Sequence, residues 1–265
     1  NASRRIKPSE VEKCQNNGVN KITEVKIGSD GIVLANSVKA EPMDVSLEEI
    51  WLALAKEVPN GDGEMVANPH DTWSDIDADL PDKEIAIMGP PPTSGTRDAW
   101  NEMVMLGGCK QVDAMTRMSK EAMHNACLTY REDGAWIEAG ENDNLIVQKL
   151  EANANRLGIF GYSFLDQNRN TIQAASINGA EPTVENISSG DYPVARSLWF
   201  YVKNAHVGNI PGMKTYVEMF MRESSIGPDG FLIGKGLIPL PEGERNAWQG
   251  KATTFQPLDP DMIEG

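Results

Sequence analysis

The chain has 265 residues, of which 40% are apolar and 24% charged, as is typical of a soluble globular protein with one large or two medium domains. Its 24 basic and 39 acidic residues give a net charge of −15, which disfavours nucleic acid and anionic membrane surfaces as partners. No apolar run is long enough to span a bilayer. The start at Asn1, without Met or a signal peptide, indicates a processed or truncated chain.

Helix and strand patterns alternate along the chain, which predicts an α/β fold with mostly parallel sheets. In the first third, the patterns predict a helix from near Pro8 to Gly18 and strands at 23–25 and 31–35 around a turn or bulge at Ser29-Asp30-Gly31. They also predict a helix at 47–56 opened by a capping box of Ser46 and Glu49. Further on, they predict strands at 84–88, 158–164, 171–177 and 197–202 and helices at 97–105, 145–150, 184–188 and 210–221, with a Met-rich helical region at 107–130 and a frayed segment from Glu244.

The turn Ser94-Gly95-Thr96 lies between the strand at 84–88 and the helix that follows. The first amides of a helix lack intrahelical partners, and the helix dipole places partial positive charge there, so a phosphate or sulfate fits at this position. Gly95 lets a ligand approach the backbone, and Ser94 and Thr96 add hydroxyl donors. The alternative is an ordinary helix cap, for which Ser and Thr are preferred residues.

Two other stretches can complete an anion site. Ala2-Ser3-Arg4-Arg5 offers a hydroxyl and guanidinium groups that bind tetrahedral oxyanions, although a solvated basic end has the same composition. The stretch at 140–144, which includes Asp143, precedes a second helix N-terminus, and the alternative is a plain helix cap by Asn142 or Asp143.

Signatures of catalysis and of metal binding are missing from the sequence. His70, His124 and His206 stand apart from any metal-ligand spacing, and no Walker A, G-x-G-x-x-G or G-x-S-x-G pattern occurs. No pair of carboxylates can be assigned acid and base roles. The sequence therefore predicts a binding protein without enzymatic activity, metal or cofactor.

Three cysteines are present, at positions 14, 109 and 127. Cys109 and Cys127 flank a helix-prone segment and can form a disulfide in an oxidising compartment, and the alternative is two buried thiols. Cys14 is then a free thiol, or its partner lies in a part of the protein outside this chain.

Taken together, the motifs resemble the periplasmic phosphate-binding protein of the high-affinity phosphate ABC transporter. The matching sequence segments follow the family's order across nearly the whole chain. They are Asn1-Ala2-Ser3-Arg4, the 85–96 segment, Gly140-Glu141-Asn142-Asp143, the stretches 157–162, 178–183 and 192–196, and the strand 198–202.

The resemblance implies a type II periplasmic-binding-protein-like fold, in which two α/β domains joined by two hinge strands enclose the ligand. Residues 1–27 and 197–265 are then the first, discontinuous domain, and residues 28–196 are the second, inserted domain. Family members begin with a strand and a Gly/Ser/Thr-rich loop that no segment of this chain matches, so about a quarter of the expected protein lies outside it.

The resemblance also implies a site and its partners. We expect Ser94, Gly95, Thr96, Ser3, Arg4, Arg97 and Asp143 to bind inorganic phosphate in the interdomain cleft. We expect a monomeric periplasmic protein that delivers phosphate to the membrane permease subunits of an ABC transporter.

Two departures from the family pattern affect the site. Pro90 stands where many members have an Arg, and Arg4 lies near the place of an Asp that accepts the proton of hydrogen phosphate. Arg4 and Arg97 are therefore the expected source of positive charge, and Asp30 or Asp143 is the candidate proton acceptor. The alternatives are another tetrahedral oxyanion, such as sulfate or molybdate, a phosphate-ester hydrolase, or a fragment that binds no ligand.

Overall fold

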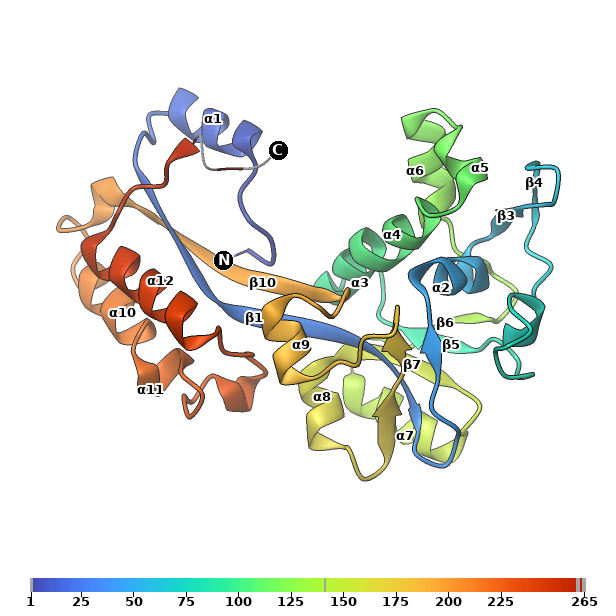
Figure 1. The fold of residues 1–265 in the computed structure, drawn as a ribbon. Helices are drawn as coiled ribbons and strands as arrows, with labels where there is room; N and C mark the ends of the chain where they lie inside the picture. The colour runs from blue at the N-terminus through green and yellow to red at the C-terminus, as the bar shows by residue number, and fades with distance from the viewer. Residues whose placement is uncertain (1, 141, 261–262, 264–265) are drawn as a thin grey trace. The chain divides into compact units, whose positions relative to one another are not determined.

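The computed structural model of the chain describes residues 2–140, 142–260 and 263. The chain divides into two compact units (Figure 1). Unit 1 comprises Asn1–Asp30, Ile187–Gly190 and Ala195–Gly265, and unit 2 comprises Gly31–Asn186 and Asp191–Val194. The domain boundaries expected from the sequence, at residues 28 and 196, stay a proposal. No helix in the described part of the chain is long and apolar enough to cross a membrane.

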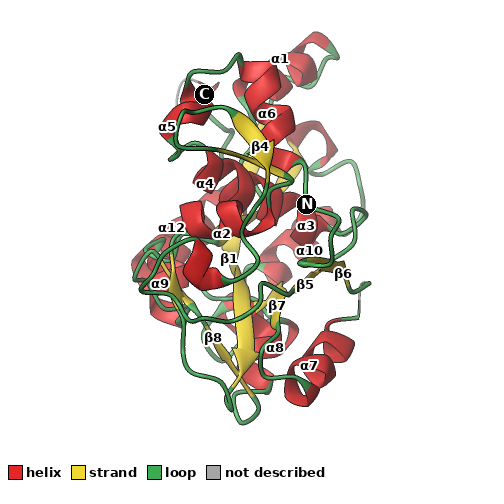
Figure 2. Cartoon of the chain, turned by 90° about the vertical axis from the view of Figure 1, so that its right-hand side faces the viewer, coloured by secondary structure: helices red, strands yellow, loops and turns green. Residues whose placement is uncertain are grey.

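The sheet of unit 2 is mixed, and not mostly parallel as the alternation of elements predicted. Its strands are β1 (Ile22–Ser37), β5 (Ile87–Gly89), β6 (Trp136–Glu138), β7 (Leu157–Gly161) and β8 (Ile172–Ala174). β5 pairs in parallel with β6 and β7, whereas β1 pairs antiparallel with β7 and β8 (Figure 2). The strands β5, β6 and β7 are joined by connections that contain helices, and such crossovers place strands in parallel. β1 is a long strand that begins in unit 1, and it runs antiparallel to its neighbours β7 and β8.

β1 is one continuous strand, so the predicted turn at Ser29-Asp30-Gly31 is wrong. The polar residues of this stretch find partners without leaving the strand. Ser29 exchanges two backbone hydrogen bonds with Ile238, at 2.8 and 2.9 Å, and the Asp30 carboxylate accepts hydrogen bonds from the Arg196 guanidinium, at 2.9 and 3.1 Å. The sequence signal for a turn was therefore overridden by tertiary contacts that satisfy the same polar groups.

The helices of unit 2 cover its sheet and bury Trp51, Trp73 and Trp100. They are α2 (Leu47–Leu54), α3 (Gly95–Trp100), α4 (Leu106–Cys109), α5 (Asp113–Thr116), α6 (Lys120–Leu128), α7 (Asp143–Ala152) and α8 (Tyr162–Gln167), with a 3₁₀ turn at Trp73–Asp75. The residues of α9 (Val184–Ser189) are divided between the two units. The capping box of α2 is confirmed, because Ser46 Oγ accepts from Glu49 N–H at 3.1 Å and Glu49 Oε2 accepts from Ser46 N–H at 2.6 Å. Short strands pair as β2 (Asp44–Val45) with β9 (Ser176–Ile177) and β3 (Glu57–Pro59) with β4 (Met65–Ala67).

Two strand predictions in unit 2 extended too far. The apolar run at 158–164 is β7 only as far as Gly161, and α8 begins at Tyr162. Gly161 is the last residue of β7 that pairs with β1, so the chain turns where strand partners end. The expected strand at 171–177 is divided into β8 and β9, which pair with different strands. A short apolar run does not by itself distinguish strand from helix.

Unit 1 pairs the first half of β1 with β10 (Ala195–Lys203) and packs helices against them. The helices are α1 (Pro8–Asn16), α10 (Met213–Phe220), α11 (Glu223–Ile226) and α12 (Glu242–Thr254), with 3₁₀ turns at Asn204–His206 and Ile233–Lys235 (Figure 1). The core around Val25, Val202 and Val217 joins them. The expectation of a frayed segment from Glu244 is wrong, because the buried Arg245 fixes α12 through Glu223 Oε1 and Leu240 O, at 2.8 and 2.7 Å.

Candidate functional site: a strand edge with a buried arginine

The carboxyl ends of three parallel strands of unit 2 lie at one edge of the sheet. β5 is flanked by β6 and β7, with Gly89 opposite Glu138 and Met88 opposite Gly158. The loop after β6 begins beside the end of β5, since Ala139 N–H donates to Gly89 O at 2.9 Å. Each of the three strands leads through a short connection into a helix, α3, α7 or α8. In open α/β sheets this edge is where ligands bind.

Ser94 is the N-cap of the helix that follows β5. Its Oγ accepts from Thr96 N–H at 3.2 Å, and its C=O accepts from Asp98 N–H at 3.2 Å. The helical path begins at Gly95 and continues through a π-helical stretch, Asn101–Met105, to Cys109, so it carries more backbone dipoles than α3 alone. The capping interpretation is therefore confirmed, and it leaves the Ser94 hydroxyl hydrogen and the Thr96 hydroxyl as donors toward a ligand.

Arg97 lies in the first turn of this helix and is buried, with 7% of its surface exposed. Its Nη1 donates to Pro90 O at 3.1 Å, which ties the 90–94 loop to the helix. The guanidinium carbon lies 3.9 Å from the ring centroid of Tyr130 and 4.4 Å from that of Trp136. Among the described residues, the buried side-chain nitrogens without a hydrogen-bond partner are Arg97 Nε, Trp100 Nε1 and Trp136 Nε1. Such unsatisfied donors are rare in buried positions and call for an acceptor.

Asp143 is the first residue of α7, the helix that follows β6. Of the two candidate caps, Asn142 occupies the N-cap position, but its side chain makes no capping hydrogen bond. Burial raises the pKa of Asp143 to about 6. Glu141, which belongs to the matching segment 140–143, lies outside the described residues. A partly buried carboxyl group therefore stands at the same strand edge as Ser94.

Ser3 and Arg4 belong to unit 1. Arg4 is exposed and forms a two-pronged ion pair with Glu10, at 2.8 and 2.9 Å. This pair holds the pKa of Glu10 at about 2 through the hydrogen bond from Arg4. Ser3 lines an open apolar groove of about 530 Å³ beside Trp199 and Tyr216. The structure thus brings Ser94, Gly95, Thr96 and Arg97 together in one turn and leaves their relation to Ser3 and Arg4 untested. Asn1 lies outside the described residues.

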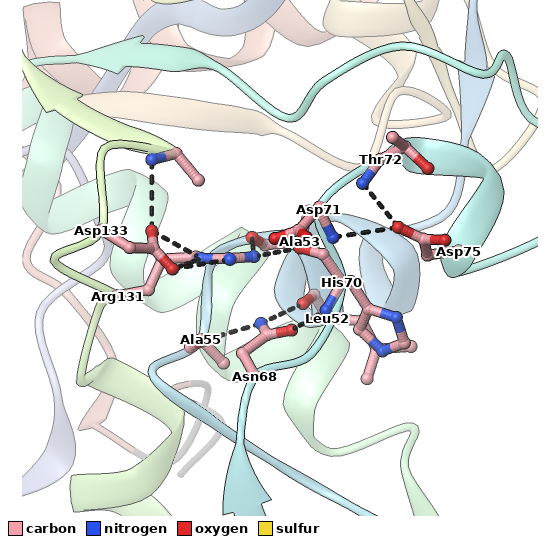
Figure 3. A network of polar contacts seen from close by, with 11 residues as sticks. Leu52, Ala53, Ala55, Asn68, His70, Asp71, Thr72, Asp75, Arg131 and Asp133 are labelled. Atoms are coloured by element: carbon pink, nitrogen blue, oxygen red, sulfur yellow. Dashed lines mark hydrogen bonds and ion pairs between the residues drawn. The ribbon is translucent and has the colours of Figure 1, made fainter.

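A polar network supports the segment that carries the aromatic partners of Arg97 (Figure 3). Arg131 donates from Nη1 to His70 O at 2.6 Å and to Ala53 O at 3.3 Å, and from Nη2 to Asp133 Oδ2 at 2.6 Å. Asn68 Nδ2 donates to two more carbonyl groups of the α2 end, Leu52 O and Ala55 O. Burial lowers the pKa of His70. These contacts fix the 130–133 segment, and so the position of Tyr130, to α2.

A disulfide joins Cys109, at the end of the helical path from Gly95, to Cys127, three residues before Tyr130. The predicted bridge is therefore confirmed, and Cys14 is a partly buried free thiol. The bridge couples the element that carries Arg97 to the element that carries Tyr130. Trp51 reinforces the connection, because its Nε1 donates to Cys127 O at 3.2 Å.

Sequence reasoning missed Tyr130 and Trp136. The signal for Trp136 was present, since the apolar residues at 135–137 are a short strand pattern, yet β6 was not among the predicted strands. No local pattern connects either ring to Arg97. Among the described residues, no group of three or more His, Cys, Asp or Glu side chains is arranged to hold a metal ion.

The chain matches one family model and several curated proteins. A PBP superfamily domain matches residues 1–224. A phosphate-binding protein PstS from Staphylococcus haemolyticus is 27% identical over 228 residues, which cover 84% of this chain and 60% of the relative. A PstS from Staphylococcus saprophyticus is 26% identical over 262 residues, which cover 95% of this chain and 67% of the relative. The chain thus spans about three fifths to two thirds of the length of these curated relatives.

Solved structures agree on the fold. The structure of a possible phosphate-binding protein from Planctomyces limnophilus matches with a TM-score of 0.69 at 23% identity, covering 96% of this chain and 80% of the other. PstS from Borrelia burgdorferi matches with a TM-score of 0.60 at 15% identity, covering 91% and 78%. The expected type II periplasmic-binding-protein-like fold is confirmed.

Proposed function

This chain belongs to the PBP superfamily, and on this premise we propose that it binds inorganic phosphate and hands it to the permease of an ABC-type uptake system. The observation that carries the proposal is Arg97. It is a buried cation in the first turn of a helix, at the carboxyl edge of parallel strands, and none of the ion pairs among the described residues involves it. A buried charge is costly unless it is paired. An anionic ligand would provide that pairing.

The proposed ligand set in unit 2 is Ser94, Gly95, Thr96, Arg97 and Asp143. The hydroxyl groups of Ser94 and Thr96 would donate to phosphate oxygens, and the start of the helix would add its dipole. Arg97 would supply the charge-assisted hydrogen bonds, which are about twice as strong as neutral ones. Ser3 and Arg4 are the proposed contribution of unit 1. Arg4 would then exchange Glu10 for the ligand, or share its guanidinium between them.

Asp143 is the proposed acceptor of the proton of hydrogen phosphate. A carboxyl group with a pKa of about 6 is mostly ionised above neutral pH, so it can accept a hydrogen bond from the P–OH group. Sulfate has no proton to donate and would be repelled by the carboxylate. Sulfate and molybdate remain the alternative ligands. A competition titration against phosphate shows which of these anions the protein prefers.

The remaining parts of the proposal follow from the relatives and from the disulfide. Relatives named phosphate-binding protein PstS support a transport component without enzymatic activity. The Cys109–Cys127 disulfide supports a location outside the cytoplasm, where disulfides form and persist. We propose that the protein is monomeric and lies in the periplasm or on the outer side of the membrane. Its proposed partner is the permease.

Equilibrium dialysis against radiolabelled phosphate tests the proposal. The natural polypeptide that contains this chain is used, after refolding from denaturant to remove prebound ligand. The proposal predicts one site per chain with a dissociation constant at or below about 10 μM. A hundredfold excess of sulfate should leave most phosphate bound. No binding at that concentration contradicts the proposed function, and equal displacement by sulfate contradicts phosphate selectivity.

A further inference from the structure

We propose that Tyr130 and Trp136 are positioning residues that hold the Arg97 guanidinium in the binding-competent place and leave its charge available to the anion. This inference rests on the proposed function, because it assigns the rings a role at the same site. It goes beyond that function in identifying what holds a buried arginine that has no carboxylate partner.

Arg97 differs from the other buried arginines of the described chain in its partners. The buried arginines of the described chain are Arg97, Arg131 and Arg245. Arg131 pairs with Asp133 at 2.6 Å, and Arg245 pairs with Glu223 at 2.8 Å. Arg97 has two aromatic rings in the place where the other two have a carboxylate. The chain therefore uses two different ways of accommodating a buried guanidinium, and it uses the uncharged way at the strand edge.

The arrangement of the rings is compact and fixed. The centroids of Tyr130 and Trp136 are 4.5 Å apart with an interplanar angle of 45°, so the guanidinium and the two rings form a triangle. Tyr130 Oη donates to Asn101 Oδ1 at 2.6 Å, one helical turn beyond Arg97. The Trp136 indole lies over Gly89, where a Cβ atom would come within 1.9 Å of the ring. Each ring is thus anchored to an element that also borders the site.

The physical consequence concerns charge. An aromatic face attracts a cation through its quadrupole and adds no negative charge. A carboxylate at the same place would neutralise Arg97 and repel a dianion. The ring faces also leave the N–H groups, which lie in the guanidinium plane, for acceptors such as Pro90 O and the ligand. Arg97 Nε, which has no acceptor among the described residues, fits a donor set that an anion or a water molecule completes.

A double-mutant cycle on phosphate affinity tests the inference in the natural polypeptide. The variants are Tyr130→Leu, Arg97→Gln and their combination, with Tyr130→Phe as the conservative control. If the ring acts through Arg97, Tyr130→Leu weakens phosphate binding about tenfold in the unaltered background, and has less than a twofold effect in the Arg97→Gln background. Tyr130→Phe keeps the ring and should stay within threefold of the unaltered protein.

The outcomes separate the inference from the proposed function. Effects of Tyr130→Leu and Arg97→Gln that multiply would overturn the inference alone, because the ring would then act independently of the arginine. Equal losses in Tyr130→Phe and Tyr130→Leu would overturn it as well, since they assign the effect to the hydrogen bond with Asn101. An unaltered protein that binds no phosphate would overturn both. Where Tyr130→Leu does not fold, as judged by urea unfolding, Trp136→Leu supplies the same cycle from the other ring.

Discussion

The guanidinium carbon of Arg97 lies 3.9 Å from the ring centroid of Tyr130, although the α-helices α4, α5 and α6 lie between the two residues in the chain. The Cys109–Cys127 disulfide joins the two segments that carry these residues. The contact between Arg97 and Tyr130 replaces the carboxylate that the other buried arginines have. Because Tyr130 is uncharged, a buried positive charge remains at the strand edge where Ser94 caps a helix. That charge is the physical basis of the anion site proposed in unit 2.

Asp143→Asn should make the ligand-free protein more stable near neutral pH. Burial raises the pKa of Asp143 from its ordinary value of 3.8 to about 6, so the folded state holds this proton more tightly than the unfolded state does. The free energy of unfolding therefore falls as the pH rises from about 4 to about 6, and the loss persists above that range. Asparagine does not titrate and removes this loss. Since the group is only partly buried, we expect a gain of about 1 kcal/mol at pH 7.5.

Urea unfolding at pH 5 and pH 7.5 in phosphate-free buffer measures this difference. Asp113→Asn is the matched control, because Asp113 is also the first residue of a helix but is exposed. The control should lose a few tenths of a kcal/mol at both pH values. An Asp143→Asn protein that is less stable than the unaltered one at pH 7.5 would show that the carboxylate is stabilising there.

Arg131→Ala should destabilise the protein by about 3 kcal/mol. The substitution leaves the carbonyl groups of Ala53 and His70 without a donor, and it removes the ion pair with Asp133 (Figure 3). The matched control is Lys56→Ala, which removes the exposed pair with Glu132 and should cost less than about 1 kcal/mol. Chemical denaturation of both variants checks the contrast, and similar losses in the two would mean that the network is not a specific support of the 130–133 segment.

Opening the disulfide by substituting both Cys109 and Cys127 with Ser should cost about 3 kcal/mol, as expected from the chain entropy of a loop of this size. It should also weaken phosphate binding, because the bridge joins the elements that carry Arg97 and Tyr130. Cys14→Ser, which alters the free thiol in unit 1, is the control and should change neither property. Thermal unfolding and phosphate titration of the two proteins measure both effects. A double variant with unchanged affinity would show that the bridge supports the fold alone.

Local signals predicted much of the fold. The capping box of Ser46 and Glu49 and the helix start near Pro8 are decided by neighbouring residues, and both are confirmed. The continuity of β1 through Ser29 and Asp30 was not predictable, because it depends on Ile238 and Arg196, which are far along the chain. α12 was not predicted for a similar reason, since it is held in place by the ion pair of Arg245 with Glu223, a residue outside the helix.

The candidate site divides in the same way. The helix start at Ser94, Gly95 and Thr96 was predictable because strand, small-residue turn and helix are adjacent in sequence. The environment of Arg97 was not, because Tyr130 and Trp136 reach it through the disulfide and the β5–β6 pairing. The burial that raises the pKa of Asp143 likewise depends on packing and leaves no trace in the local sequence.

We propose that the buried Arg97, which has no carboxylate partner among the described residues, binds phosphate. Isothermal titration of phosphate into the unaltered natural polypeptide and into its Arg97→Gln variant tests this role. Arg117→Gln, which alters an exposed arginine of the same unit, is the control. We predict a dissociation constant at or below about 10 μM for the unaltered protein and the control. For Arg97→Gln we predict affinity at least tenfold weaker, since a hydrogen bond to a charged group contributes about 1.5–3 kcal/mol. Equal affinity in all three proteins, or no phosphate binding by the unaltered one, would show that Arg97 does not bind phosphate.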